Sequence, residues 1–138
     1  MPAETRRVQP GIYLMFLGGA VTEDEITEQL ALTTQATIDD AADEPILLLD
    51  AVKLTNPLKV ARVMPNHLKV ARVIAVNSNR SGAVLVERLA QKLPGFPVEV
   101  TRTQLDAVAR AKAIRGTEDV EDLHCDYLGV RYADKETG

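Results

Sequence analysis

The segment PILLLD (Pro45–Asp50) is a continuous apolar run that opens on a proline and closes on an aspartate. A run without polar alternation is typical of a strand that is covered on both faces of a sheet. VARVIAVN (residues 70–77) is a second run of this kind, and GIYLMFLGGA (residues 11–20) is a β-rich run that ends in a glycine turn. FPVEVT (residues 96–101) has the alternation of a short strand. These runs predict the strands of a central sheet.

A helix is predicted between the strands at residues 11–20 and residues 45–50. Thr22 and Glu25 have the spacing of a capping box, which satisfies two backbone N–H groups at a helix start. Ile26 and Leu30 then begin an apolar face at helical spacing. The far end, residues 39–44, carries four acidic side chains that oppose the helix dipole, so we expect this end to fray.

Two further helices are predicted after the second covered run. Residues 78–95 begin with serine and asparagine caps and stop at a Pro-Gly pair. Their apolar stripe is Val86, Leu89, Ala90 and Leu93. Residues 103–116 have a threonine and an aspartate at capping-box spacing and a glycine after the last turn.

The hexapeptide LKVARV occurs twice, at Leu58–Val63 and at Leu68–Val73. The first copy follows a proline at the first position of a helix, which predicts a short helix. The second copy has no cap and continues into further β-branched residues, which predicts a strand. We expect Lys59 and Arg62 on one exposed helix face, and Lys69 and Arg72 on opposite sides of the start of a strand.

The order of these elements predicts the fold class. Strands that alternate with helices indicate a single-domain α/β sandwich with a mostly parallel central sheet, whose first strand or strands can be antiparallel. We expect the domain to cover residues 11–115, after an N-terminal lead-in at residues 1–10. Residues 116–138 are expected to form an acidic, partly ordered C-terminal extension. A chain of 138 residues can bury a sufficient core without metals or disulfides.

Composition excludes several classes of function. A net charge of −4 gives no field that attracts nucleic acid. The apolar runs are shorter than the roughly 20 residues of a membrane helix. The single cysteine rules out an internal disulfide framework and suits a reducing compartment. We therefore expect a cytoplasmic protein that neither binds nucleic acid nor inserts into a membrane.

Few residues are arranged for catalysis or metal binding. His124 and Cys125 are adjacent, so their side chains point apart on a helix or a strand, and no second cysteine or histidine lies at ligand spacing. His67 stands alone after a proline. Acid–base work would fall on Asp50 or on one of the two histidines, without visible partners. We therefore expect no metal, no cofactor and no enzymatic activity.

Three polar residues remain as candidates for a switch or the rim of a ligand site. Asp50 closes a covered strand, at the edge where open α/β sheets place their ligands, although aspartate is also a common loop cap. Thr55, at a predicted helix start, could accept a phosphate or simply serve as an N-cap. Asn77 closes the second covered run and would lie on the same rim.

Four segments together resemble the SpoIIAA-like group of STAS-type domains: GGAVTEDEITEQL (18–30), PILLLDAVKLT (45–55), VARVIAVNSN (70–79) and FPVEVTRTQLDAVARA (96–111). The resemblance implies a mixed sheet with helices packed largely on one face, no catalysis, and action through protein partners or small or lipid-like ligands. Some relatives carry an Asp-Ser phosphorylation pair. Its nearest counterpart here is Thr55–Asn56, with a shorter loop and no acidic residue before the hydroxyl.

Two functions therefore stand as hypotheses. The first is a non-enzymatic STAS-like interaction or regulatory module, forming a homodimer and binding a protein partner. The alternative is a domain for a small-molecule or lipid-like ligand. That alternative requires an apolar cavity between the sheet and the helices, rimmed by Asp50 and Asn77.

Overall fold

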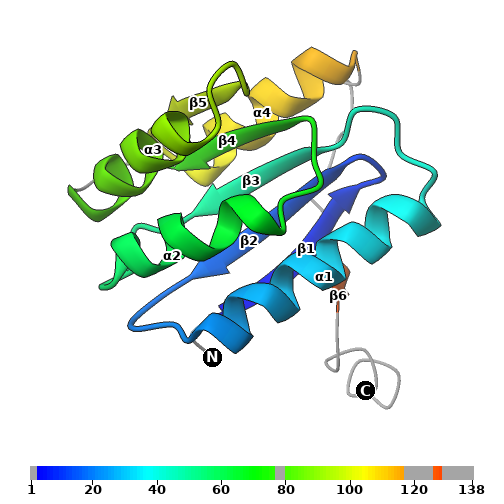
Figure 1. Ribbon diagram of the computed structural model, residues 1–138. Coiled ribbons are helices and arrows are strands. Elements are labelled where there is room, and N and C mark those ends of the chain that lie inside the picture. The colour runs from blue at the N-terminus through cyan, green and yellow to red at the C-terminus, as the bar shows by residue number, and fades with distance from the viewer. Residues whose placement is uncertain (1–2, 77–79, 117–125, 129–138) are drawn as a thin grey trace.

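The computed structural model describes residues 3–76, 80–116 and 126–128, and it shows an α/β fold built on one mixed sheet (Figure 1). The sheet has six strands in the order β5-β4-β3-β2-β1-β6. The strands are β1 (Ala3–Gln9), β2 (Ile12–Leu17), β3 (Ile46–Asp50), β4 (Arg72–Val76), β5 (Val98–Thr101) and β6 (Asp126–Leu128). The helices are α1 (Glu23–Asp39), α2 (Pro57–Val63), α3 (Arg80–Lys92) and α4 (Gln104–Arg115), with a 3-10 turn at Met64–Asn66.

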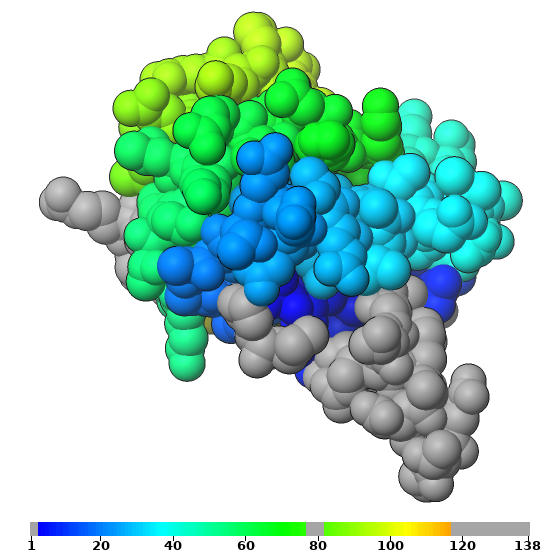
Figure 2. Space-filling view, turned by 60° about the horizontal axis from the view of Figure 1, so that its bottom comes forward, coloured from blue at the N-terminus to red at the C-terminus, as the bar shows by residue number. Residues whose placement is uncertain are grey.

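The order of the strands explains where the helices lie. Strands β2 to β5 are parallel neighbours, and each crossover adds the next strand on the same side of the last one. Crossovers between parallel strands are right-handed, so crossovers that advance in one direction place their helices on one face. Helices α1, α2 and α3 accordingly share a face (Figure 1), and Figure 2 shows α1, in blue to cyan, beside the green segment that contains α2.

The core has two layers, one on each face of the sheet. Beneath α1, α2 and α3, the buried residues include Met15 of β2, Leu49 of β3 and Leu89 of α3. On the other face, α4 packs against the sheet, and its Ala107 and Ala111 belong to the second core layer. Small residues on α4 let its backbone lie close to the sheet.

The segment PILLLD forms β3, as predicted, and all five of its strand residues are buried. It lies between two parallel strands, with Leu48 beside Leu14 of β2 and Ile74 of β4. The α/β class expected from the sequence is therefore confirmed.

The N-terminal ten residues differ from the expected lead-in because they contain β1. This strand pairs antiparallel with β2, in a register that places Thr5 opposite Met15. The Thr5 hydroxyl is fully buried and donates to Gln29 Oε1 of α1 at 2.5 Å. On its other side β1 pairs with β6, so the C-terminal extension contributes a strand to the sheet.

Helix α1 begins with the predicted capping box, in which Thr22 and Glu25 each bond the backbone N–H of the other. Its acidic end is held rather than frayed. The carboxylate of Asp40, the residue after the helix, accepts from Arg7 Nε at 2.9 Å and from the Tyr13 hydroxyl at 2.6 Å. Tyr13 is fully buried, and this burial, together with the Asp40 contact, raises its pKa to about 12.

The two LKVARV copies adopt different structures. The first lies in α2, with Lys59 and Arg62 both exposed. The second leads into β4, which begins at Arg72. Lys69 borders a shallow hollow beside α1, whereas Arg72 is paired with Glu99, which also bonds Arg110 of α4. Because α1 and α4 lie on opposite faces of the sheet, Lys69 and Arg72 are on opposite sides, as predicted.

Candidate functional site

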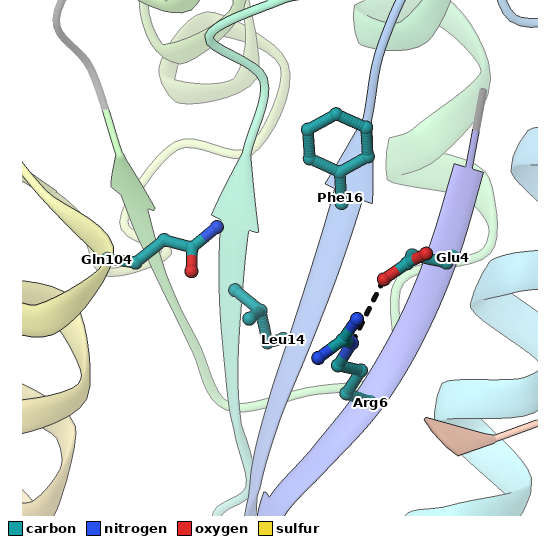
Figure 3. A pocket seen from close by; sticks show the side chains of 5 residues that line it. All are labelled: Glu4, Arg6, Leu14, Phe16 and Gln104. Carbon is teal, nitrogen blue, oxygen red and sulfur yellow. Dashed lines mark hydrogen bonds and ion pairs between the residues drawn. The ribbon is translucent and has the colours of Figure 1, made fainter. Parts of the chain in front are cut away.

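Within residues 3–76, 80–116 and 126–128, the face of the sheet that carries α4 is covered only in part. Helix α4 packs on β3, β4 and β5 and reaches β2, which leaves a hollow beside α4, over β1 and β2. The hollow, called here the β1–β2 hollow, has a volume of about 150 Å³. Its lining residues are Glu4, Arg6, Leu14, Phe16 and Gln104 (Figure 3).

Strand alternation brings these side chains to one face. Glu4 and Arg6 are two residues apart on β1, and their sheet partners on β2 are Phe16 and Leu14. Arg6 Nε lies 2.9 Å from Glu4 Oε2, so the two charges form an ion pair on the wall of the hollow (Figure 3). Leu14 is almost buried, and Phe16 is half-buried. The hollow therefore combines an apolar floor with a charged wall of no net charge.

Asp50 stands behind this hollow, at the end of β3. Its side chain is nearly buried, at 7% exposure. One carboxylate oxygen accepts from the Val52 N–H at 3.1 Å, and the other accepts from Gln104 Nε2. A carboxylate only accepts hydrogen bonds, so the Gln104 amide is oriented with its nitrogen toward Asp50. Asp50 thus caps its own loop and anchors the start of α4.

The other predicted site residues do not join this cluster. Thr55 is exposed, and its backbone N–H donates to the Gly19 carbonyl at 2.9 Å. The N-cap position of α2 belongs to Asn56, whose amide bonds the N–H and the carbonyl of Val21. Asp50 is connected to α4 by the Gln104 amide, whereas Thr55 is connected to Gly19, which follows β2. Asn77 lies outside the described residues.

The histidine and cysteine candidates do not form a reactive centre where they are described. His67 is exposed and lies beside α1, at a shallow hollow of about 240 Å³ that Lys69 also lines. His124 and Cys125 fall outside the described residues. Among residues 3–76, 80–116 and 126–128, no three histidine, cysteine or acidic side chains are grouped as metal ligands. In the same part of the chain, no helix has the length and apolar character required to span a bilayer.

None of the five lining residues of the hollow was predicted from the sequence as a candidate: Glu4, Arg6, Leu14, Phe16 and Gln104. Gln104 is 54 residues from Asp50, and the capping motif around it, Thr103–Asp106, indicates a helix start and not a site. Glu4 and Arg6 lie in the segment expected to be a lead-in. The available signal was that Glu4 and Arg6 are two residues apart, which places their charges on one face of a strand. This signal can be used only after β1 has been recognised as a strand.

Comparison of the sequence with protein-family models gives no match, and comparison with curated proteins gives none either.

Proposed function

We propose that the protein is a non-enzymatic interaction module of STAS-like type, which forms a homodimer in the cytoplasm and binds a protein partner at the β1–β2 hollow. The observation that carries this proposal is the size of the hollow on a partly covered sheet face. Sites for drug-sized ligands have volumes of about 300–1,000 Å³. A hollow of about 150 Å³ accommodates roughly one aromatic ring. It therefore fits one anchoring side chain of a protein better than a whole ligand.

The chemistry of the lining supports a protein partner. Interfaces draw most of their binding energy from a few buried anchors, surrounded by polar groups that exclude water. Leu14 and Phe16 supply the apolar contact, while Glu4 and Arg6 supply polar atoms on the rim. The winding of α1, α2 and α3 on one face supports the STAS-like part of the proposal.

The position of Asp50 supports a role without catalysis. A general base needs a lone pair within reach of a substrate proton. Asp50 is only 7% exposed, and its two carboxylate oxygens accept from Val52 and Gln104, so little of the carboxylate is open to a substrate. The Asp50 carboxylate caps the loop that follows β3 and holds the start of α4 in place.

Photo-crosslinking tests the proposed binding site. A benzophenone amino acid at Arg6 is expected to capture one partner from the native host, whereas the same group at Ile38 does not. Ile38 is a matched control because it is 64% exposed and lies on α1, on the other face of the sheet. Phe16→Ala should weaken capture at least tenfold, since loss of a central anchor costs about 2 kcal/mol or more. Capture at Ile38 but not at Arg6 would place the interface elsewhere.

A further inference from the structure

Strand β5 forms one edge of the sheet (Figure 1), and its outer backbone row has no strand beside it in the part of the chain that the structure describes. Backbone groups of successive strand residues point to alternate sides. The Pro97 carbonyl accepts from the Val73 N–H of β4 at 3.1 Å, so Glu99 and Thr101 also point their backbone groups to β4. The N–H and C=O groups of Val98 and Val100 therefore point away from the sheet. The opposite edge of the described sheet is the three-residue strand β6, which pairs with β1.

Apolar side chains flank this edge. The described residues include four large hydrophobic side chains that are exposed: Ile38, Leu58, Val100 and Leu105. Val100 lies on β5 at 48% exposure, and Leu105 lies in the first turn of α4, which follows β5 directly, at 60% exposure. Two of these four side chains, Val100 and Leu105, thus lie at the β5 edge of the sheet.

The charge of the strand is neutralised within the subunit. Sheet edges are commonly protected by charged side chains that repel a second strand. The one acidic residue of β5 is Glu99, and its carboxylate bonds Arg72 of β4 and Arg110 of α4. The pKa of Glu99 is lowered, chiefly by the Arg110 contact, so the carboxylate stays ionised and paired near neutral pH. Glu99 is therefore held toward α4 and its charge is balanced.

We propose that β5 pairs antiparallel with β5 of a second copy, about a two-fold axis at Val100. This inference rests on the homodimer of the proposed function and assigns its interface. A strand placed against its own two-fold copy is necessarily antiparallel, and both subunits then use the same patch. The two outer rows of N–H and C=O groups satisfy each other. The dimer contains one continuous sheet that runs through both subunits.

The register follows from the charges. An axis at Glu99 would place two carboxylates directly opposite each other, which is unfavourable across a strand pair. An axis at Val100 places Val100 opposite its own copy and Glu99 opposite Thr101, so an apolar pair forms on one face and a carboxylate–hydroxyl pair on the other. The antiparallel arrangement also brings the exposed Leu105 toward the exposed Pro97 of the other copy.

Site-directed crosslinking tests this interface in the full chain. Val100→Cys, made together with Cys125→Ser so that one thiol remains, is expected to give a covalent dimer with a short bis-maleimide. Leu58→Cys in the same background is the matched control, since Leu58 is 56% exposed and lies on α2. Dimer formation by the Leu58→Cys variant at the same or a higher yield would overturn the proposal.

Sedimentation equilibrium supplies the second test. Val100→Lys should raise the dimer dissociation constant at least tenfold, while Ile38→Lys leaves it unchanged. Val100→Pro is a further variant, because the lost N–H points away from β4 and the pairing within the subunit is kept. Circular dichroism checks that each variant is folded. Dimerisation unchanged in both Val100 variants overturns the β5 interface but leaves the homodimer standing. A wild-type monomer at all concentrations overturns both, while crosslinking at Arg6 still tests the partner site separately.

Discussion

Replacing Tyr13 by phenylalanine removes one oxygen from a fully buried side chain and leaves the ring in place. The hydroxyl donates to Asp40 Oδ2 at 2.6 Å and accepts from the Gly11 N–H at 3.1 Å. A hydrogen bond to a charged group contributes about 1.5–3 kcal/mol, and a buried N–H left without an acceptor costs about 1–3 kcal/mol. Asp40 keeps its contact with Arg7. The loss should therefore lie near the lower end of the sum of these two contributions, and we expect Tyr13→Phe to lower the free energy of unfolding by about 3 kcal/mol.

The cost of this substitution should depend on pH. Burial and the Asp40 contact raise the pKa of Tyr13 from 10 to about 12. A folded-state pKa above the unfolded value means that the neutral hydroxyl stabilises the fold. This stabilisation is complete below pH 10 and is lost as the pH rises through about 12. A pKa difference of about 2 corresponds to about 3 kcal/mol. Between these pH values, wild type should lose its advantage over Tyr13→Phe.

Urea unfolding, followed by circular dichroism, measures both effects. Wild type and Tyr13→Phe are compared at neutral pH and at steps between pH 10 and pH 12. Asp40→Asn, made alone and with Tyr13→Phe, gives the coupling energy of the pair, which we expect to be about 1–2 kcal/mol. Two results would refute the reasoning. One is that Tyr13→Phe lowers the free energy of unfolding by less than about 0.5 kcal/mol at neutral pH. The other is that the difference between wild type and Tyr13→Phe stays constant from neutral pH to pH 12.

Three other predictions test different contacts. Gly11→Ala should cost about 2 kcal/mol and Gly95→Ala about 1 kcal/mol in thermal unfolding. Both glycines have positive φ, but only at Gly11 would the new Cβ meet a side chain, the guanidinium of Arg115. Equal losses in the two variants would contradict this. Thr5→Val should cost about 1–2 kcal/mol in urea unfolding by leaving Gln29 Oε1 without its donor, and Gln29→Leu in the same chain should restore most of it; absence of recovery would argue against the buried bond. Glu99→Gln should reduce the loss of stability that wild type shows at acid pH. The lowered pKa of Glu99 stabilises the fold above the ordinary value of 4.5, and this contribution disappears as the pH falls through the lowered value. The same loss of stability at acid pH in both proteins would exclude that role.

The parts of the fold that the sequence predicts are those set by neighbours along the chain. The run Pro45–Asp50 predicts a covered strand because burial on both faces leaves no polar position. The capping box at Thr22 is likewise local chemistry. In α3 the apolar pattern predicts a helix, but not its rotation: Leu85 and Leu89 are buried and Ala90 is exposed. Rotation depends on which residues the sheet presents to the helix.

Strand β1 could not be recognised from the sequence because polar side chains in it have hydrogen-bonding partners that lie far away along the chain. The arginines in this segment make it resemble a solvated lead-in. In the structure Arg7 reaches Asp40, 33 residues along the chain, and Thr5 reaches Gln29. The candidate site has the same limit. Asp50 is predicted from the end of its strand, whereas Gln104, its partner on α4, is brought there by the topology alone.

The pairing of β1 with β6 has a consequence for synthesis on the ribosome. Strand β1 is translated before the parallel strands, and β6 follows it by more than 100 residues. At about 5–20 residues per second, the outer edge of β1 waits roughly 6–23 s for its neighbour. During this interval the nascent chain presents unpaired backbone groups between Ala3 and Gln9. We expect the charged side chains of Glu4, Arg6 and Arg7 to disfavour pairing of this edge with another chain during that interval.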